Sequence, residues 1–142
     1  MIRVVIADDH RLVRQGIHAL LSNADNINVV GEAEDGEEAI SLVERLSPDV
    51  LVVDVSMPRL NGLEAAKRLF ARGHKTPIVV LSMYGEADLV RRAFESGVIG
   101  YVLKQSTAAE LVEAVRAAVD GERFLSSALE ELRPTLHPAN GS

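Results

Sequence analysis

The stretch VLVVDVSMP (residues 50–58) runs from a continuous apolar segment directly into a carboxylate. Four aliphatic residues precede Asp54, a pattern typical of a central parallel strand buried on both faces. Desolvating an unpaired carboxylate is unfavourable, so a buried acid needs a cationic partner or a metal ion. The stretch therefore predicts a buried strand over residues 50–54 that brings Asp54 to the end of a sheet.

The rest of the chain repeats the pattern of an apolar strand followed by a stretch of helical period. Strands are predicted at residues 2–8, 28–33, 50–54, 78–82 and 99–104. The helix after the first strand is expected to bury one stripe made of Leu12, Val13, Ile17, Leu20 and Leu21. Glycines are placed to end the last three helices, and Thr107-x-x-Glu110 has the form of a capping box.

The predicted strands differ in hydrophobicity, and the difference indicates their order. The strands at 2–8, 50–54 and 78–82 are almost purely aliphatic, whereas those at 28–33 and 99–104 also carry glycine and polar residues. The latter two are expected at the edges, which fits the order 2-1-3-4-5. The predicted fold class is α/β, a single doubly wound (βα)5 domain whose five-stranded parallel sheet has helices on both faces.

Length and composition limit the classes of protein this chain can be. A chain of 142 residues fits one domain, predicted at 1–121, with 122–142 as a linker or tail that is partly helical and then flexible. The net charge of −6 argues against binding nucleic acid unaided. The chain has no cysteine, no signal-peptide pattern and no apolar run near the ~20 residues that span a bilayer, so we expect a cytoplasmic protein without a membrane partner.

Polar residues follow four of the predicted strands. Asp8 and Asp9 end the first strand, Asp54 the third, Ser82 the fourth and Lys104 the fifth. The carboxyl ends of parallel strands share one rim, where ligands bind. Clustered carboxylates favour Mg²⁺, and a lysine with a hydroxyl suits a phosphoryl group. Asp54 is then a candidate nucleophile of the aspartyl-phosphate type.

These residues carry a resemblance to a known family. Over about residues 1–121 the chain resembles a response-regulator receiver domain, through Asp8-Asp9, Asp54 with Met57-Pro58 and Asn61-Gly62, Ser82, Tyr101 and Lys104. The stretches IADDHRLVRQGI, DVSMPRLNGLEA, VVLSMYGEADLV and GVIGYVLK are most similar to the NarL/FixJ (LuxR-type) subfamily.

The resemblance implies a role for each acid. Asp54 would accept a phosphoryl group from a phosphohistidine on a sensor histidine kinase. Asp9 would bind Mg²⁺, or Mn²⁺, directly. Asp8 would help through water, Asp54 would share the ion, and the backbone carbonyl of Ser56 would supply another ligand.

The remaining residues of the motif are implied to read out the phosphoryl group. Lys104 would pair with its oxygens, and Ser82 would hydrogen-bond to it and draw the following loop inward. Tyr101 would then change rotamer and reshape the surface formed by the fourth strand, fourth helix and fifth strand. Phosphorylation adds roughly −1.5 to −2 charges at one point, which is sufficient to drive such a switch.

The resemblance also implies partners and shows two departures. The subfamily usually controls transcription through a C-terminal helix-turn-helix domain, which we do not expect within residues 122–142. The resemblance also implies that phosphorylation allows a homodimer to form. Many receivers have a small residue at the position of Met83, so access to Asp54 is in question. Many have proline at the position of Gln105, so the loop geometry behind Lys104 is in question as well.

Three other functions compete with a signalling switch. A Mg²⁺-dependent phosphohydrolase would need a second acid two residues after Asp54, where Ser56 stands. A nucleotide or flavin module would need a glycine-rich loop after the first strand, which is missing. A receiver-like interaction module without phosphorylation does not account for the complete set of acids, serine and lysine. The four histidines show no ligand spacing, and none is expected in a metal site.

Overall fold

The computed structural model describes residues 1–136. The expected flexible end of the tail, 137–142, and His137 lie outside the described residues. The elements in chain order are β1 (Ile2–Ala7), α1 (Arg11–Ser22), β2 (Ile27–Ala33), α2 (Gly36–Leu46), β3 (Val50–Asp54), α3 (Gly62–Ala71), β4 (Ile78–Ser82), α4 (Ala87–Glu95), β5 (Gly100–Leu103), the 3₁₀ turn η1 (Lys104–Ser106), α5 (Thr107–Val119), β6 (Phe124–Leu125) and the 3₁₀ helix η2 (Ser127–Thr135).

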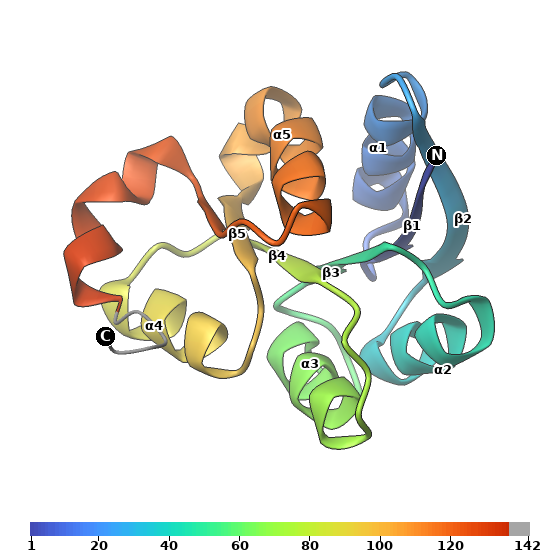
Figure 1. Cartoon of the computed structure of the whole chain (residues 1–142), viewed down its shortest axis with the longest axis horizontal. Helices are drawn as coiled ribbons and strands as arrows, with labels where there is room; N and C mark the ends of the chain where they lie inside the picture. The colour runs from blue at the N-terminus through green and yellow to red at the C-terminus, as the bar shows by residue number, and fades with distance from the viewer. Residues whose placement is uncertain (137–142) are drawn as a thin grey trace.

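The strands form one parallel sheet between two layers of helices, as predicted. The order is β2-β1-β3-β4-β5-β6, so the predicted 2-1-3-4-5 order is confirmed and one strand is added. Helices α1 and α5 cover one face, and α2, α3 and α4 cover the other (Figure 1). Asp54 pairs in register with Leu81, and Ser82 with Leu103, which aligns the carboxyl ends of the central strands at one rim.

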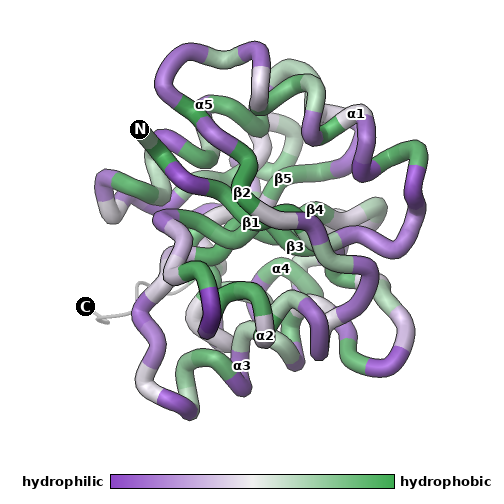
Figure 2. Tube along the Cα trace, turned by 90° about the vertical axis from the view of Figure 1, so that its right-hand side faces the viewer, coloured by the Kyte–Doolittle hydropathy of each residue, from purple (hydrophilic) through white to green (hydrophobic). Residues whose placement is uncertain are grey.

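The core consists of the central strands and the inner faces of the helices. The segments VVIA of β1, VLVV of β3 and IVVL of β4 are at most 1% exposed. Their side chains alternate between the two faces, as the period of a strand requires. Figure 2 shows these hydrophobic segments gathered between the helix layers. Within the described part of the chain, no helix has the length and hydrophobicity to cross a membrane.

Helix α1 buries less of its apolar stripe than predicted. Ile17 and Leu21 lie in the core, but Leu12 is 81% exposed and Val13 is 42% exposed. Helix α1 begins at the rim, and its side chains from Val13 to Leu20 line an open groove opposite the start of α5. The first turn of α1 therefore borders an open groove. No side chain of residues 1–136 fills this groove, so the apolar residues of that turn stay exposed.

The segment after α5 is also placed differently from the prediction, which put β5 at an edge. Gly100 and Tyr101 of β5 pair with Phe124 and Leu125 of β6, so β6 is the edge strand. Helix η2 then runs alongside α4 (Figure 1) and buries Leu129. A strand of two residues is too short to show a hydrophobic period, and for this reason the sequence pattern did not reveal it.

The capping box predicted at the start of α5 is not formed. The N-cap residue of this helix is Ser106, which makes no side-chain capping bond. The Glu110 carboxylate instead accepts hydrogen bonds from the Ser126 hydroxyl at 2.5 Å and the Ser127 amide at 3.0 Å. The Ser126 hydroxyl oxygen also accepts from the Leu103 amide at 2.9 Å. Glu110 therefore ties α5 to the segment that follows β6.

The start of α2 requires glycine because another backbone segment approaches it closely. A Cβ atom at Gly36 would lie 2.2 Å from the carbonyl oxygen of Leu60, whereas one at Gly16 in α1 would meet nothing within 4 Å. We expect Gly36→Ala to lower the free energy of unfolding by about 1–3 kcal/mol. Gly16→Ala is the matched control and should raise it by about 1 kcal/mol through helix propensity. Urea unfolding measures both, and equal effects would contradict the close approach.

Candidate functional site

Three acids and one lysine meet at the carboxyl rim of the sheet. Asp8 directly follows β1, Asp54 ends β3, and Lys104 directly follows β5. The Lys104 Nζ atom lies 2.7 Å from Asp54 Oδ2 and 3.7 Å from Asp8 Oδ2. Asp8 and Asp54 are 0% and 1% exposed, and Asp9 is more accessible beside them. The topology has therefore brought together acids that are 46 residues apart in the chain.

The two oxygens of Asp54 have different partners. Oδ2 bonds to Lys104, and Oδ1 accepts from the Ser56 amide at 3.1 Å. Burial raises the pKa of Asp54, with the nearby Asp8 charge adding to the effect and the bonds from Lys104 and Ser56 opposing it. Burial alone would lower the pKa of Lys104, but the Asp54 and Asp8 carboxylates outweigh it and raise that pKa. Lys104 is thus a cation held beside these acids.

The acids fit a divalent metal ion. Oxygens of Asp8, Asp9 and Asp54 and a ring nitrogen of His10 all lie within 4.8 Å of one another. Asp8 Oδ2 is buried and has no hydrogen-bond partner, so this oxygen is available for a cation. Ser56, Asp9 and His10 line one open cavity of about 530 Å³. Hard oxygen donors of this kind suit Mg²⁺.

The structure places the ring of His10 beside these acids, a position that was not expected for any histidine. The other described histidines lie elsewhere on the surface, where His18 contacts Glu32 and His74 contacts Glu44. The signal that could have found His10 is its position, immediately after the acid pair at the end of β1.

Ser82 and Tyr101 are joined through one carbonyl group. The Ser82 hydroxyl donates to the Tyr84 carbonyl at 3.2 Å and accepts from the Tyr84 amide at 3.0 Å. The Tyr101 hydroxyl donates to the same carbonyl at 2.5 Å. Tyr101 is fully buried, and burial raises its pKa. The backbone of Tyr84, which sequence reasoning missed, therefore links the rim of β4 to the ring on β5.

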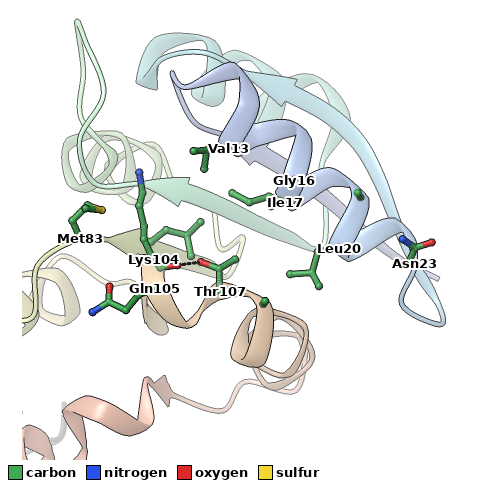
Figure 3. Close-up of a pocket in the computed structure, with 12 residues that line it drawn as sticks. Val13, Gly16, Ile17, Leu20, Asn23, Met83, Lys104, Gln105 and Thr107 are labelled. Carbon is green, nitrogen blue, oxygen red and sulfur yellow. Dashed lines mark hydrogen bonds between the residues drawn. The ribbon is translucent and has the colours of Figure 1, made fainter.

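The departures at Met83 and Gln105 both line a groove beside the site. Met83, Lys104 and Gln105 line one side of a groove of about 710 Å³, and Val13, Ile17 and Leu20 of α1 line the other (Figure 3). The η1 turn that begins at Lys104 is held by a bond of 2.8 Å from the Thr107 hydroxyl to the Lys104 carbonyl, drawn dashed in Figure 3. Lys104 reaches Asp54 in this arrangement.

The loop that carries Ser56 is anchored to the start of α2. Asp35 caps α2 by accepting a hydrogen bond from the Glu38 amide at 2.9 Å. The Asp35 carboxylate also pairs with the Arg59 guanidinium, which lowers the pKa of Asp35. The Gly36 amide donates to the Leu60 carbonyl at 3.0 Å. Sequence reasoning did not find the Arg59 contact, because the two residues lie on different loops.

This anchor gives a pH-dependent prediction. Asp35→Ala should lower the free energy of unfolding at pH 7 by about 1 kcal/mol through loss of the cap. Because the folded-state pKa of Asp35 is lowered, its contribution is complete above the ordinary aspartate pKa of about 3.9 and is lost as the pH falls through the folded value. The difference between Asp35→Ala and wild type should therefore shrink on acidification from pH 7 to 3, measured by urea unfolding. Asp35→Asn, which keeps a cap acceptor without the charge, should lie between the two, and a difference that grows in acid would contradict the assignment.

The fold and this rim define a class: a doubly wound α/β domain with an acidic site and a lysine at the carboxyl ends of its strands. Residues 4–116 match the model of the response regulator receiver domain. The chain belongs to this family of two-component signalling domains.

Relatives and solved structures agree with this assignment. The transcriptional regulatory protein LiaR of Bacillus subtilis is 42% identical over 127 residues, which cover 89% of this chain and 60% of LiaR. The response regulator GacA of Pseudomonas viridiflava is 39% identical over 126 residues, 89% of this chain and 59% of GacA. The chain thus spans about 60% of the length of these relatives.

The fold matches LuxR-family structures over most of its length. A LuxR-family response regulator from Aurantimonas superposes with a TM-score of 0.90 at 32% identity, covering 95% of this chain and 96% of the other. The receiver domain of the putative regulator NarL from Mycobacterium tuberculosis gives a TM-score of 0.82 at 37% identity, with 85% and 98% covered. The resemblance to LuxR-type regulators is confirmed.

Proposed function

We propose that this domain is a phosphorylation-controlled switch in which Asp54 is the phosphoacceptor. The observation that carries the proposal is a buried carboxylate on the rim, bonded to Lys104 at 2.7 Å, with Asp8 and Asp9 close enough to share one metal ion. The donor would be a phosphohistidine on a sensor histidine kinase. The approach of the kinase is supported by the exposed apolar side chains of Val13 and Met83, which line the groove, and of Leu12 on the first turn of α1.

In the proposed transfer, an Asp54 oxygen attacks phosphorus while the bond from phosphorus to the histidine nitrogen breaks, and the nitrogen keeps the electron pair. Asp8, Asp9, Asp54 and the Ser56 carbonyl would hold Mg²⁺ or Mn²⁺, which supplies positive charge against the phosphoryl oxygens. The ammonium of Lys104, beside Asp54, would offset further negative charge on the phosphoryl oxygens. The fixed backbone bond from Ser56 to Asp54 Oδ1 orients the carboxylate for the attack.

The switch is proposed to start at Ser82. Its hydroxyl must leave the Tyr84 carbonyl in order to donate to a phosphoryl oxygen. The Tyr84 carbonyl also accepts the hydrogen bond from the Tyr101 hydroxyl, so a shift of the loop after β4 changes the contact that fixes the Tyr101 ring on β5. A Cβ atom at Gly85 in this loop would lie 2.7 Å from the Leu129 side chain, which places η2 in contact with the moving segment.

The output is proposed from the relative LiaR, which is named as a transcriptional regulatory protein. DNA would be reached through a C-terminal helix-turn-helix domain, and phosphorylation would allow a homodimer to form. The absence of cysteine supports a cytoplasmic location. Ser56 stands where an acid would be needed for rapid hydrolysis, which supports storage of the phosphoryl group over turnover of external substrates.

The test is incubation with Mg²⁺ and a small acyl phosphate or phosphoramidate, followed by intact-mass measurement. We expect one phosphoryl group per chain, lost on treatment with base or hydroxylamine and absent when EDTA replaces Mg²⁺. Failure to form an adduct would contradict the proposal. Steady release of phosphate over many turnovers from a general phosphatase substrate would instead favour a phosphohydrolase.

A further inference from the structure

The imidazole of His10 lies on the acidic site at the distance of a ligand. Its Nδ1 atom is 3.2 Å from Asp9 Oδ1 and 3.6 Å from Asp8 Oδ1. Two adjacent ligand atoms that each lie about 2.1 Å from one ion are roughly 3 Å apart. The nitrogen and the Asp9 oxygen therefore have the separation of neighbouring ligands of a single ion.

The polar contacts of the His10 ring within residues 1–136 are with Asp8 and Asp9, the acids of the site itself. His10 is the N-cap residue of α1, yet its side chain makes no capping bond. The ring is 66% exposed and borders the cavity that Asp9 and Ser56 also line. The His10 amide donates to Asp8 Oδ1 at 2.8 Å, so the backbone that carries the ring is fixed to the acid cluster.

The buried acid beside the ring gives an independent indication of a cation. Asp8 is 0% exposed, and its Oδ2 atom has no hydrogen-bond partner. The nearest cation, Lys104 Nζ, is 3.7 Å away, beyond hydrogen-bond distance. The site therefore offers two kinds of ligand atom. Asp8 Oδ2 is an oxygen that needs a cation, and His10 Nδ1 is a nitrogen on the accessible side.

We propose that His10 Nδ1 is an additional ligand when this site holds a first-row transition ion, so that the site prefers such ions over Mg²⁺ more strongly than an all-oxygen site would. Imidazole is a good ligand for Ni²⁺ and Zn²⁺, whereas Mg²⁺ favours oxygen and retains its waters. The affinity order of divalent ions at a site with nitrogen runs upward from Mn²⁺ to Ni²⁺. This inference rests on the metal site of the proposed function.

The test is calorimetric titration of the full chain, without a histidine tag, with NiCl₂ and separately with MgCl₂ at one fixed pH. We expect His10→Ala to raise the Ni²⁺ dissociation constant by about tenfold or more. The Mg²⁺ dissociation constant should change by a much smaller factor, so the ratio of the two constants moves. His74→Ala, which removes a histidine that contacts Glu44 and is not among the atoms of the metal cluster, should leave the ratio unchanged. Equal changes for both ions in His10→Ala, or no change for either, would overturn the inference.

A further variant separates this inference from the proposed function. Asp9→Ala should weaken the binding of both Ni²⁺ and Mg²⁺ sharply, because the substitution removes an oxygen ligand that both ions use. If Asp9→Ala leaves both affinities unchanged, the metal site itself is wrong. If Asp9→Ala weakens the binding of both ions while His10→Ala changes neither dissociation constant, the metal site is supported and only the role of His10 is wrong.

Discussion

Asp54→Asn is expected to abolish phosphorylation completely, so that intact mass stays at the unmodified value under conditions in which the wild-type chain gains one phosphoryl group. The amide has no anionic oxygen to attack phosphorus, and no other described acid combines burial with a 2.7 Å bond to Lys104. Asp88→Asn is the matched control. Asp88 is an exposed acid on α4 paired with Arg91 and Arg92, and its variant should be phosphorylated like the wild type.

The loss in Asp54→Asn should not come from unfolding. Burial raises the pKa of Asp54, which means that the folded state disfavours its charge. Removing that charge offsets the loss of the Lys104 bond, so the free energy of unfolding at pH 7 should stay within about 1 kcal/mol of wild type. Circular dichroism with urea unfolding checks this. An adduct that persists in a folded Asp54→Asn protein would show that another residue is the acceptor.

The parts of the fold that sequence predicts are those that follow a period. The aliphatic runs of β1, β3 and β4 have no polar face to alternate with, so they require cover on both sides, and the structure supplies it. Strand β6, with two residues, is too short to show a period. Glu110 illustrates a different failure, because its carboxylate is used by Ser126 and Ser127, partners that local sequence does not indicate.

The residues of the site likewise fall into those that the sequence predicts and those that it does not. Residues at strand ends, such as Asp54 and Lys104, could be brought together from the topology alone, since parallel strands share one rim. Leu12 was misassigned because helical spacing says which residues share a face but not whether a neighbour covers the first turn. The Arg59 contact with Asp35 and the position of the His10 ring depend on loop conformation, and no periodicity describes a loop.

Lys104→Met is expected to be the most destabilising change at the site. Lys104 is 15% exposed and is the cation that faces both Asp8 and Asp54, so its removal leaves two buried acids without compensation. Breaking a buried ion pair lowers stability by 3–5 kcal/mol, and partial exposure reduces this to about 2–4 kcal/mol here. Urea unfolding in EDTA measures the loss. The control Lys67→Met, at an exposed position on α3, should change stability by less than about 0.5 kcal/mol.

The double variant Asp54→Asn/Lys104→Met distinguishes charge compensation from packing. If Lys104 stabilises the fold by offsetting the acids, then removing the Asp54 charge relieves the repulsion that Lys104→Met exposes. The double variant should then be more stable than Lys104→Met alone, with a coupling free energy of about 1–3 kcal/mol between the two positions. Added Mg²⁺ should likewise restore part of the stability of Lys104→Met, because a bound cation replaces the missing charge. Additive losses without rescue by Mg²⁺ would mean that Lys104 acts through its aliphatic stem, and the acids would then need no cation to fold.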